Sequence, residues 1–502
     1  MTRITTLFLI LFIAFITNGQ SIDESFSKDK MKKDFEVFKS ISTKANSGVK
    51  KYRTEKQIDS IYGWANQQIE KITSYREFYN LIFTISDFEG SCHNEISLSK
   101  KRAENLKNET FGYFPFPIKW IEGKWLININ DKEIPLGAEI VTINDVPIVK
   151  IVPKLYKYYS TDGFNLTGKR IGLMTSFSKY YRLNFGLTKI FTVSYLDPNS
   201  KQLKTKNIQS VGNKAYYENF RKMHSMSIDQ YYYADLKENQ KYNYKQLNQS
   251  TGILTINTFD IGDEKTSEHK KYKHFLDSVF MSIKKNKTLN LIVDVRNNGG
   301  GNDPNDLLTY SYLTNRIFKE NQQAWVSFRK IPLIKYYNIG IPKFLRTLVV
   351  GKYNKEFQTI FPKEQNGKFY QDENSDDHKI RTPNQNAFNG NIYLLISPKV
   401  ASAGSLFAAM VSGNENTKTI GEETLGGYYG HNGHSSLSYK LPKSKIEITF
   451  SVVNLEQDVP KKENQKYGNG IMPNYKVTQS YEDFLKNTDT QMNFTMELLL
   501  KK

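Results

Sequence analysis

Apolar side chains near the N-terminus recur at three- and four-residue steps, which is the period of an amphipathic helix. Over residues 57–88 the positions that follow this spacing are Ile58, Ile61, Trp64, Ile69, Ile72, Phe78, Leu81 and Ile82. The spacing stops at a polar turn over residues 87–95. We therefore predict an N-terminal helical region over residues 20–110.

Alternating apolar and polar residues, the pattern of half-buried strands, follow over residues 111–155. Together with a further strand over 189–198, this predicts a small β module spanning residues 111–200. Its stretch "GAEIVTINDVPI" (137–148) resembles a segment of PDZ domains, and a PDZ-like module would bind a peptide C-terminus by strand addition. Residues 201–250 are rich in Tyr, Lys and Asn without a regular pattern, so we predict an irregular linker there.

Residues 251–480 have the pattern of an α/β core. A buried strand begins at Thr251, an amphipathic helix follows, and a second apolar strand ends in glycines near residue 300. Strand, helix and strand in this order predict a βαβ unit with a parallel sheet. The segment 391–413 repeats the step from strand to helix, and residues 481–502 are predicted as a C-terminal helix or tail.

The first 19 residues have the features of a secretory signal peptide. Arg3 precedes an apolar run from Leu7 to Ile16, and small residues lead to a cleavage site after Gly19. This run is shorter than the roughly 20 apolar residues that a membrane span needs. We expect an exported protein, periplasmic or secreted, without an integral membrane span after signal removal. A homo-oligomer is left open.

Composition narrows the classes of partner. The chain carries 70 Lys and Arg against 51 Asp and Glu, a formal charge of +19. The lysines are scattered rather than gathered in a stripe with aromatic residues, so we expect a solvated surface and no nucleic-acid partner. Cys92 is the only cysteine, which excludes an intramolecular disulfide and a cysteine metal cluster. We expect neither a metal nor a cofactor, and Cys92 is interpreted as a small buried side chain.

Two segments have the residue types of a reactive site. "LIVDVRNNGGGN" (291–302) ends a buried strand in three glycines, at the end of a parallel sheet where ligands gather. Glycines there let backbone amides face a developing negative charge. Asp294 and Arg296 are interpreted as a structural ion pair. "SPKVASAGSLF" (397–407) places Ser402 between alanines at the start of a helix, where a plain packing turn is the alternative.

These segments resemble the C-terminal processing (tail-specific) serine peptidases and the tricorn core. "GILTINTF", "LIVDVRNNGGG", "ISPKVASAGSLF" and "GNGIMPNYKV" are similar to four blocks of that family, in the same order. The resemblance implies a crotonase-like α/β core and hydrolysis of peptide bonds. It makes Ser402 the nucleophile, with amides of Ala403 and of Gly299 or Gly300 forming the oxyanion hole.

The resemblance leaves the base open. The processing peptidases use a Lys 25 residues after the nucleophile, where this chain has Gly427. The tricorn branch uses a His in an upstream turn instead, and "SDFEGSCHNE" (86–95) offers His93 in that setting. His431 and His434 are the alternative bases. For the acid that orients the His, the resemblance points to Glu456 or Asp458, and we favour Glu456.

The resulting hypothesis is an exported serine endopeptidase that acts on proteins or peptides through an acyl-enzyme on Ser402. The alternative is a catalytically inactive relative that binds a peptide or a hydrophobic ligand, as the related retinoid-binding proteins of the eye do. The missing Lys is the feature that such a relative would show.

Overall fold

The computed structural model describes residues 20–225, 236–301, 304–341 and 345–501. The predicted signal peptide (1–19) and Asn302 lie outside these ranges. Within the described ranges, every helix is either too short or too polar to span a bilayer.

The N-terminal region is helical, as predicted. Thr54 and Ser74 each begin a helix with a capping box, in which side chain and backbone satisfy each other's free donors, so the periodic stretch forms two helices. The second helix ends at Gly90 in the left-handed conformation, which turns the chain toward a short strand. The elements are α1 (Lys28–Ala45), α2 (Glu55–Ile69), α3 (Tyr75–Glu89), β1 (Glu95–Ser97) and α4 (Lys100–Lys107).

A six-stranded antiparallel sheet with two helices follows. The strand order is β2-β3-β4-β6-β7, with β5 paired to β4. Asn144 and Asp145 both have positive φ, as the two central residues of a tight hairpin turn require. The elements are β2 (Ile118–Ile121), β3 (Lys124–Ile127), β4 (Glu139–Ile143), β5 (Val146–Pro147), α5 (Ile148–Leu155), η1 (Tyr156–Tyr158), α6 (Thr167–Phe185) and β6 (Ile190–Leu196).

The segment 201–250 is more regular than the sequence suggested. It contains β7 (Leu203–Gln209), α7 (Asn213–Arg221), α8 (Glu238–Lys241) and β8 (Tyr242–Gln246). Both strands are edge strands, and β7 buries only Ile208. A strand with one buried side chain lacks the alternation that reveals strands in a sequence.

The α/β core is confirmed. Its sheet has the order β18-β15-β14-β10-β9-β8, with only β8 antiparallel to its neighbour. The inner strands are almost entirely buried, as parallel strands covered on both faces should be. The elements are β9 (Thr251–Ile256), α9 (Ser267–Lys285), β10 (Asn290–Asp294), α10 (Asn305–Ser311), β14 (Asn391–Ile396), α12 (Ala403–Ser412), β15 (Thr417–Gly421) and β18 (Tyr475–Lys476).

The chain ends in α13 (Tyr481–Lys486) and α14 (Thr490–Leu500). Arg296 pairs with Asp294 at 2.7 Å and with Asp489 at 2.7 Å. The pair that the sequence suggested is thus extended by a third residue, which fixes the start of α14 beside the core sheet.

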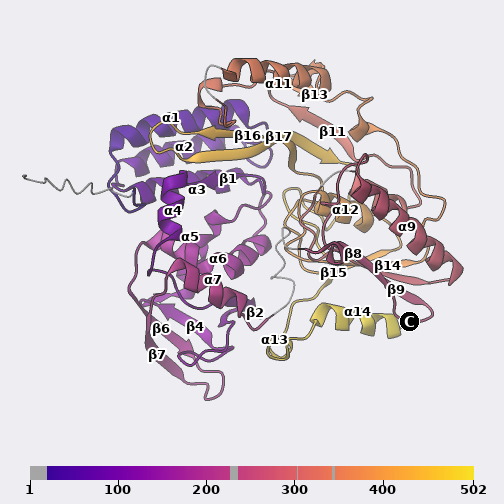
Figure 1. Ribbon diagram of the computed structural model, residues 1–502, viewed down its shortest axis with the longest axis horizontal. Coiled ribbons are helices and arrows are strands. Elements are labelled where there is room, and N and C mark those ends of the chain that lie inside the picture. Colours follow the sequence, from indigo (N-terminus) through magenta and orange to yellow (C-terminus); the bar gives the residue numbers. More distant parts are fainter. Residues whose placement is uncertain (1–19, 226–235, 302–303, 342–344, 502) are drawn as a thin grey trace, which may run out of the picture.

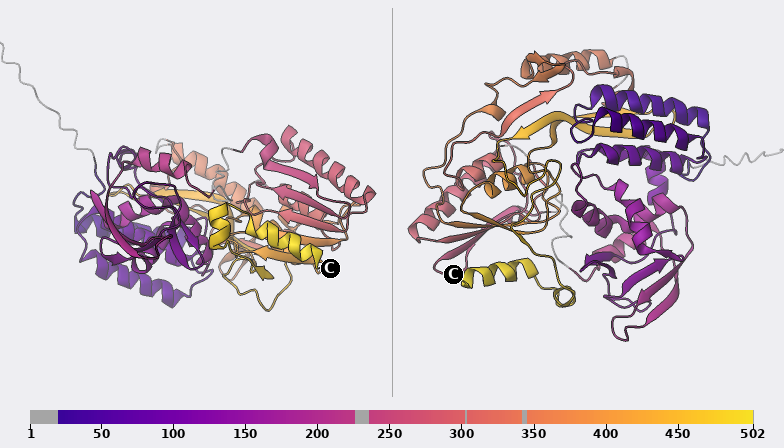
Figure 2. Two further views of the ribbon diagram at one scale, coloured as in Figure 1. Left: turned by 90° about the horizontal axis from the view of Figure 1, so that it is seen from below. Right: turned by 180° about the vertical axis from the view of Figure 1, so that it is seen from behind.

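A third sheet, which the sequence did not reveal, joins the two halves. Figure 1 shows its long strands running from the core across the N-terminal helices, and Figure 2 shows the same connection from behind. β1 pairs with one end of β17 and β11 with the other. The elements are β11 (Asn321–Val326), η4 (Ile334–Tyr336), α11 (Arg346–Ile360), β12 (Lys363–Gln365), β13 (Lys368–Tyr370), η6 (Asp376–His378), β16 (Asn432–Lys440) and β17 (Glu447–Gln457).

Candidate active site

Ser402 lies at the turn between β14 and α12, directly before the first residue of the helix. Its backbone has φ 51° and ψ −134°, a conformation that costs an L-residue free energy and is concentrated at functional sites. The residue at position 404 must be small for a steric reason, because a Cβ on Gly404 would lie 2.3 Å from the carbonyl oxygen of Asn298. The glycine loop after β10 therefore packs directly on the start of α12.

The same loop approaches the serine closely. Gly300 has φ 112°, and a Cβ there would lie 2.7 Å from Cβ of Ser402. Its amide donates to Oδ1 of Asn298 at 2.9 Å, so it is engaged within the loop. Of the amides that the sequence proposed for the oxyanion hole, that of Gly300 is therefore already used within the loop, which leaves those of Gly299 and Ala403 as the candidates.

His93 reaches the serine from the N-terminal region. Its Nε2 lies 3.4 Å from Oγ of Ser402, across 309 residues of sequence, and both side chains are half-buried. Burial lowers the pKa of His93 below its ordinary value, although the Asp162 carboxylate opposes this shift. The imidazole is therefore neutral at neutral pH, which is the form that can accept a proton.

Asp162, which the sequence analysis missed, holds the turn that carries His93. Its carboxylate accepts the amide of Cys92 at 2.9 Å and the amide of Gly427 at 3.1 Å. Burial raises its pKa, while His93 and these two amides oppose the shift. Gly427 is the position where the processing peptidases have their Lys. Here its backbone binds a carboxylate instead.

The Cys92 thiol lies between the imidazole and this carboxylate. Sγ is 3.3 Å from Nδ1 of His93, and the thiol also interacts with the carboxylate of Asp162. Cys92 is half-buried, and burial raises the pKa of its thiol well above the ordinary value. It is a neutral polar bridge rather than the inert apolar side chain that the sequence suggested.

The two alternative histidines differ in position. The His431 ring stacks on the His93 ring with centroids 5.0 Å apart. It is buried, and burial together with His93 lowers its pKa well below the ordinary value. His434 lies 3.6 Å from the buried Glu320. Within the described residues, His93 is the histidine that contacts Ser402.

Neither predicted acid contacts His93 in the part of the chain that is described. Glu456 is exposed on β17. Asp458 pairs with Arg316 at 2.8 Å and accepts the amide of Lys319 at 3.0 Å, which ties the end of β17 to the segment before β11. The carboxylate whose charge raises the pKa of His93 is that of Asp162.

A half-buried lysine close to the histidines, Lys51, also escaped the sequence analysis. Lys51 Nζ donates to Oδ1 of Asn454 at 2.5 Å and to the carbonyl of Leu455 at 2.9 Å. Burial lowers its pKa to about 8. Its charge lowers the pKa of His431 further, which favours a neutral second imidazole.

Glu89 fixes the start of the His93 turn from the other side. It accepts hydrogen bonds from the side chains of Ser42, Asn46 and Asn94. Burial raises its pKa to about 7.

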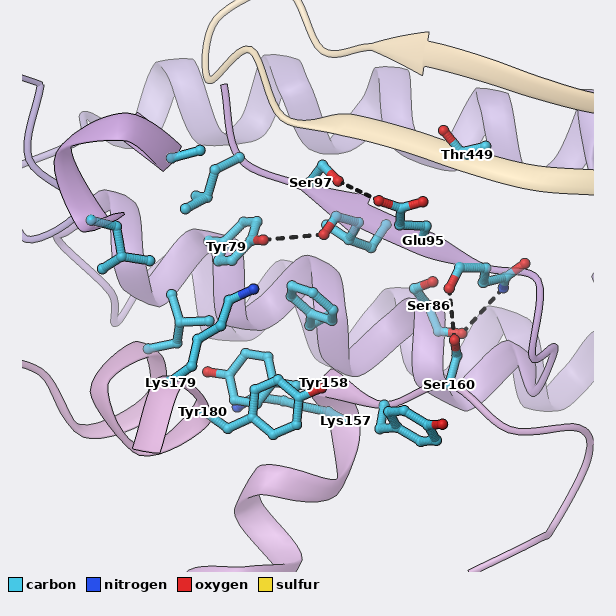
Figure 3. Close-up of a pocket in the computed structure, with 18 of the residues that line it drawn as sticks. Tyr79, Ser86, Glu95, Ser97, Lys157, Tyr158, Ser160, Lys179, Tyr180 and Thr449 are labelled. Atoms are coloured by element: carbon cyan, nitrogen blue, oxygen red, sulfur yellow. Dashed lines mark hydrogen bonds between the residues drawn. The ribbon is translucent and has the colours of Figure 1, made fainter. Parts of the chain in front are cut away.

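A cavity of about 1190 Å³ adjoins the site. Cys92 and His93 form part of its wall, and α3, β1, η1, α6 and α7 supply most of the rest. Figure 3 shows tyrosine and lysine side chains from these elements facing one another beneath β1. A space of this size exceeds a typical small-molecule pocket and is wide enough for a peptide segment.

Comparison with known proteins agrees with this geometry. Residues 250–477 match the family model of peptidase family S41. Mature CPAF complexed with lactacystin is similar with a TM-score of 0.57 at 11% identity, covering 93% of this chain and 98% of that one. Mature CPAF alone gives a TM-score of 0.57 at 12% identity, covering 93% and 96%. At such identities the likeness shows a shared fold.

The photosystem II D1 C-terminal processing protease is also similar, at 12% identity over 90% of this chain and 94% of that one. Its TM-score is 0.37. No curated protein sequence matches the chain.

Glu89 generates a prediction about stability. Because its pKa is raised from 4.5 to about 7, the folded state holds a proton that the unfolded state releases. The associated stability is present below pH 4.5 and is lost as the pH rises through about 7. In denaturant titrations, raising the pH from 5 to 8 should reduce the free energy of unfolding of wild type by about 2 kcal/mol more than that of Glu89→Gln.

The matched control is Glu104→Gln, which changes an exposed carboxylate on α4. It should keep the wild-type dependence on pH. Equal slopes for wild type and Glu89→Gln would contradict the assignment.

Proposed function

We propose, from the match of residues 250–477 to peptidase family S41, that the chain is an exported serine endopeptidase of that family with Ser402 as nucleophile and His93 as base. The observation that carries the proposal is the 3.4 Å approach of His93 Nε2 to Ser402 Oγ. A serine hydroxyl is a weak nucleophile until a base within hydrogen-bond reach takes its proton. The strained backbone of Ser402 presents that hydroxyl at the start of α12.

The proposed reaction is acyl transfer. Oγ of Ser402 attacks the carbonyl carbon of the scissile peptide bond, and its proton passes to Nε2 of His93. The oxyanion accepts hydrogen bonds from the amides of Ala403 and Gly299, with the N-terminus of α12 adding a favourable dipole. His93 then protonates the leaving amine, and water hydrolyses the ester by the same route in reverse.

Asp162 and Cys92 are proposed as positioning residues. Asp162 binds the Cys92 amide and raises the pKa of His93 electrostatically, so it stabilises the imidazolium that forms during attack. The Cys92 thiol contacts Nδ1 of His93 and leaves Nε2 directed at the serine. This role replaces the one predicted for Glu456 or Asp458.

The second candidate, an inactive relative that binds peptide, is favoured by one observation. The position of the family Lys is occupied by Gly427, whose amide is bound to Asp162. Reaction of Ser402 with a serine-directed probe separates the two candidates.

The proposed substrate is a protein or peptide. Export rests on the signal-like residues 1–19, and docking of a peptide C-terminus on the sheet of β2 to β7 rests on the PDZ-like stretch.

The nucleophile is tested with a fluorophosphonate probe, which reacts with activated serines. Wild type should be labelled, and Ser402→Ala should lose labelling completely because the acceptor oxygen is gone. Ser405→Ala, one helical turn further along, should retain it. Absence of labelling in wild type, with peptide binding intact, would favour the inactive relative.

The base is tested by comparing two histidine variants in the same probe assay and in peptide hydrolysis. His93→Ala should reduce kcat/KM by about 10⁴-fold, since it removes general-base catalysis. His431→Ala should cost much less, because its ring contacts His93 and not Ser402. The reverse order would identify His431 as the base.

The role of Asp162 is tested by the pH dependence of kcat/KM. Because burial lowers the pKa of His93, the acid limb of the wild-type profile should lie below pH 6.5. Asp162→Asn removes a charge that raises this pKa, so the limb should move to lower pH while kcat falls by about 10- to 100-fold. Cys92→Ser should retain more activity than Cys92→Ala. A fall in kcat without movement of the limb would reduce Asp162 to a structural role.

Export is tested by the mature N-terminus. Protein recovered outside the cytoplasm should begin at Gln20, and a chain starting at that residue should remain inside the cell. An exported chain that retains residues 1–19 in its intact mass would contradict cleavage after Gly19.

A further inference from the structure

The cavity beside His93 has more basic than acidic groups in its wall. Its acidic residues are Asp87, Glu95 and Glu218, and its basic residues are Lys107, Lys157, Lys179, Lys214 and Arg221. Asp87 is already paired with Lys169. The cavity therefore has an excess of positive charge even before substrate enters.

Most polar groups in this wall are satisfied within the protein. The Tyr79 hydroxyl donates to the carbonyl of Ile96 at 3.1 Å, and the Ser160 hydroxyl donates to the carbonyl of Asn94 at 2.8 Å. Figure 3 shows both bonds at the edge of β1. Lys157 donates to Oδ1 of Asn184 at 2.7 Å.

Lys179 differs from these groups. It extends from α6 into the space beneath β1, next to Tyr180 (Figure 3). Among the described residues, no carboxylate forms an ion pair with its ammonium, and Glu95 acts on it only through the longer-range field. Burial lowers its pKa, because a cation loses hydration there without gaining a direct partner.

We propose that this cavity is a substrate subsite for a carboxylate, which pairs with Lys179. The inference rests on the proposed peptidase function and names its substrate class: peptides that carry an acidic side chain within reach of Ser402. A carboxylate entering the cavity gains a charge-assisted hydrogen bond from an ammonium that is already partly dehydrated. Phe83, Tyr158 and Tyr180 supply an apolar wall for the adjoining part of the peptide.

The test uses pooled quenched ten-residue peptides of mixed sequence. Within each pair the pools differ only by Glu or Gln at one position, and each pool is made with a free or an amidated C-terminus. Wild type should cleave at least one Glu pool about 10-fold faster in kcat/KM than its Gln counterpart, mainly through a lower KM. A preference that follows the free C-terminus instead of Glu overturns the acidic side chain as the ligand.

Lys179→Met should bring that ratio close to one, and Lys179→Glu should favour peptides that carry Lys at the same position. Lys150→Met, which changes an exposed lysine on α5, should keep the wild-type ratio. Thermal unfolding of each variant establishes that it is folded. A wild-type ratio near one in every pair, or a ratio that Lys179→Met leaves unchanged, overturns the proposal.

Failure of the peptidase function itself has a different signature. If wild type cleaves nothing, binding of the same fluorescent peptides to Ser402→Ala is measured by anisotropy. Tighter binding of the carboxylate form that is lost in Lys179→Met then supports the subsite without catalysis. Equal binding of both forms overturns the subsite.

Discussion

The candidate site depends on the pairing of β1 with β17. Three residues, Glu95 to Ser97, pair with Glu447 to Thr449, and this short ladder fixes the N-terminal region against a ribbon that extends from the core. His93 lies two residues before β1, so the ladder determines where its imidazole sits. Hydrogen bonds from the Cys92 amide to Asp162 and from the Asn94 side chain to Glu89 hold the turn that carries His93 on its other sides. Without this docking, Ser402 and His93, the proposed nucleophile and base, would lie in separate parts of the molecule.

The core contributes rigidity of a different kind. Ser402 can occupy its costly backbone conformation because β14 and α12 are buried on both sides of it. The glycine loop also packs so closely on Ser402 that a Cβ at Gly300 would lie 2.7 Å from Cβ of the serine. The serine is thus positioned by steric exclusion, and the histidine by hydrogen bonds at the edge of a sheet.

The sequence predicted what short-range patterns encode. Helical periodicity predicts α2 and α3, and apolar strands that end in glycines predict the parallel core. The sequence also singles out Ser402 and His93, which the structure brings together. Asp162 was missed because it joins the site only through contacts with residues far along the chain. Neither Glu456 nor Asp458 contacts His93 among the described residues, because register decides which face a strand turns to its partner. The register of β17 depends on β1 and β11, which are distant in sequence, as well as on the neighbouring β16.

The local electrostatics keep the imidazoles of His93 and His431 unprotonated in the resting protein. Burial lowers the pKa of both stacked histidines, and His93 lowers that of His431 further, so neither is charged in the resting protein. In the proposed reaction, a proton taken from Ser402 creates an imidazolium where one was disfavoured, and the Asp162 carboxylate counteracts this cost. The carboxylate acts through the field and through the Cys92 turn rather than by a direct bond to the ring. Such an arrangement gives up some stabilisation of the cation, and in return the imidazole stays unprotonated to lower pH than an exposed histidine does.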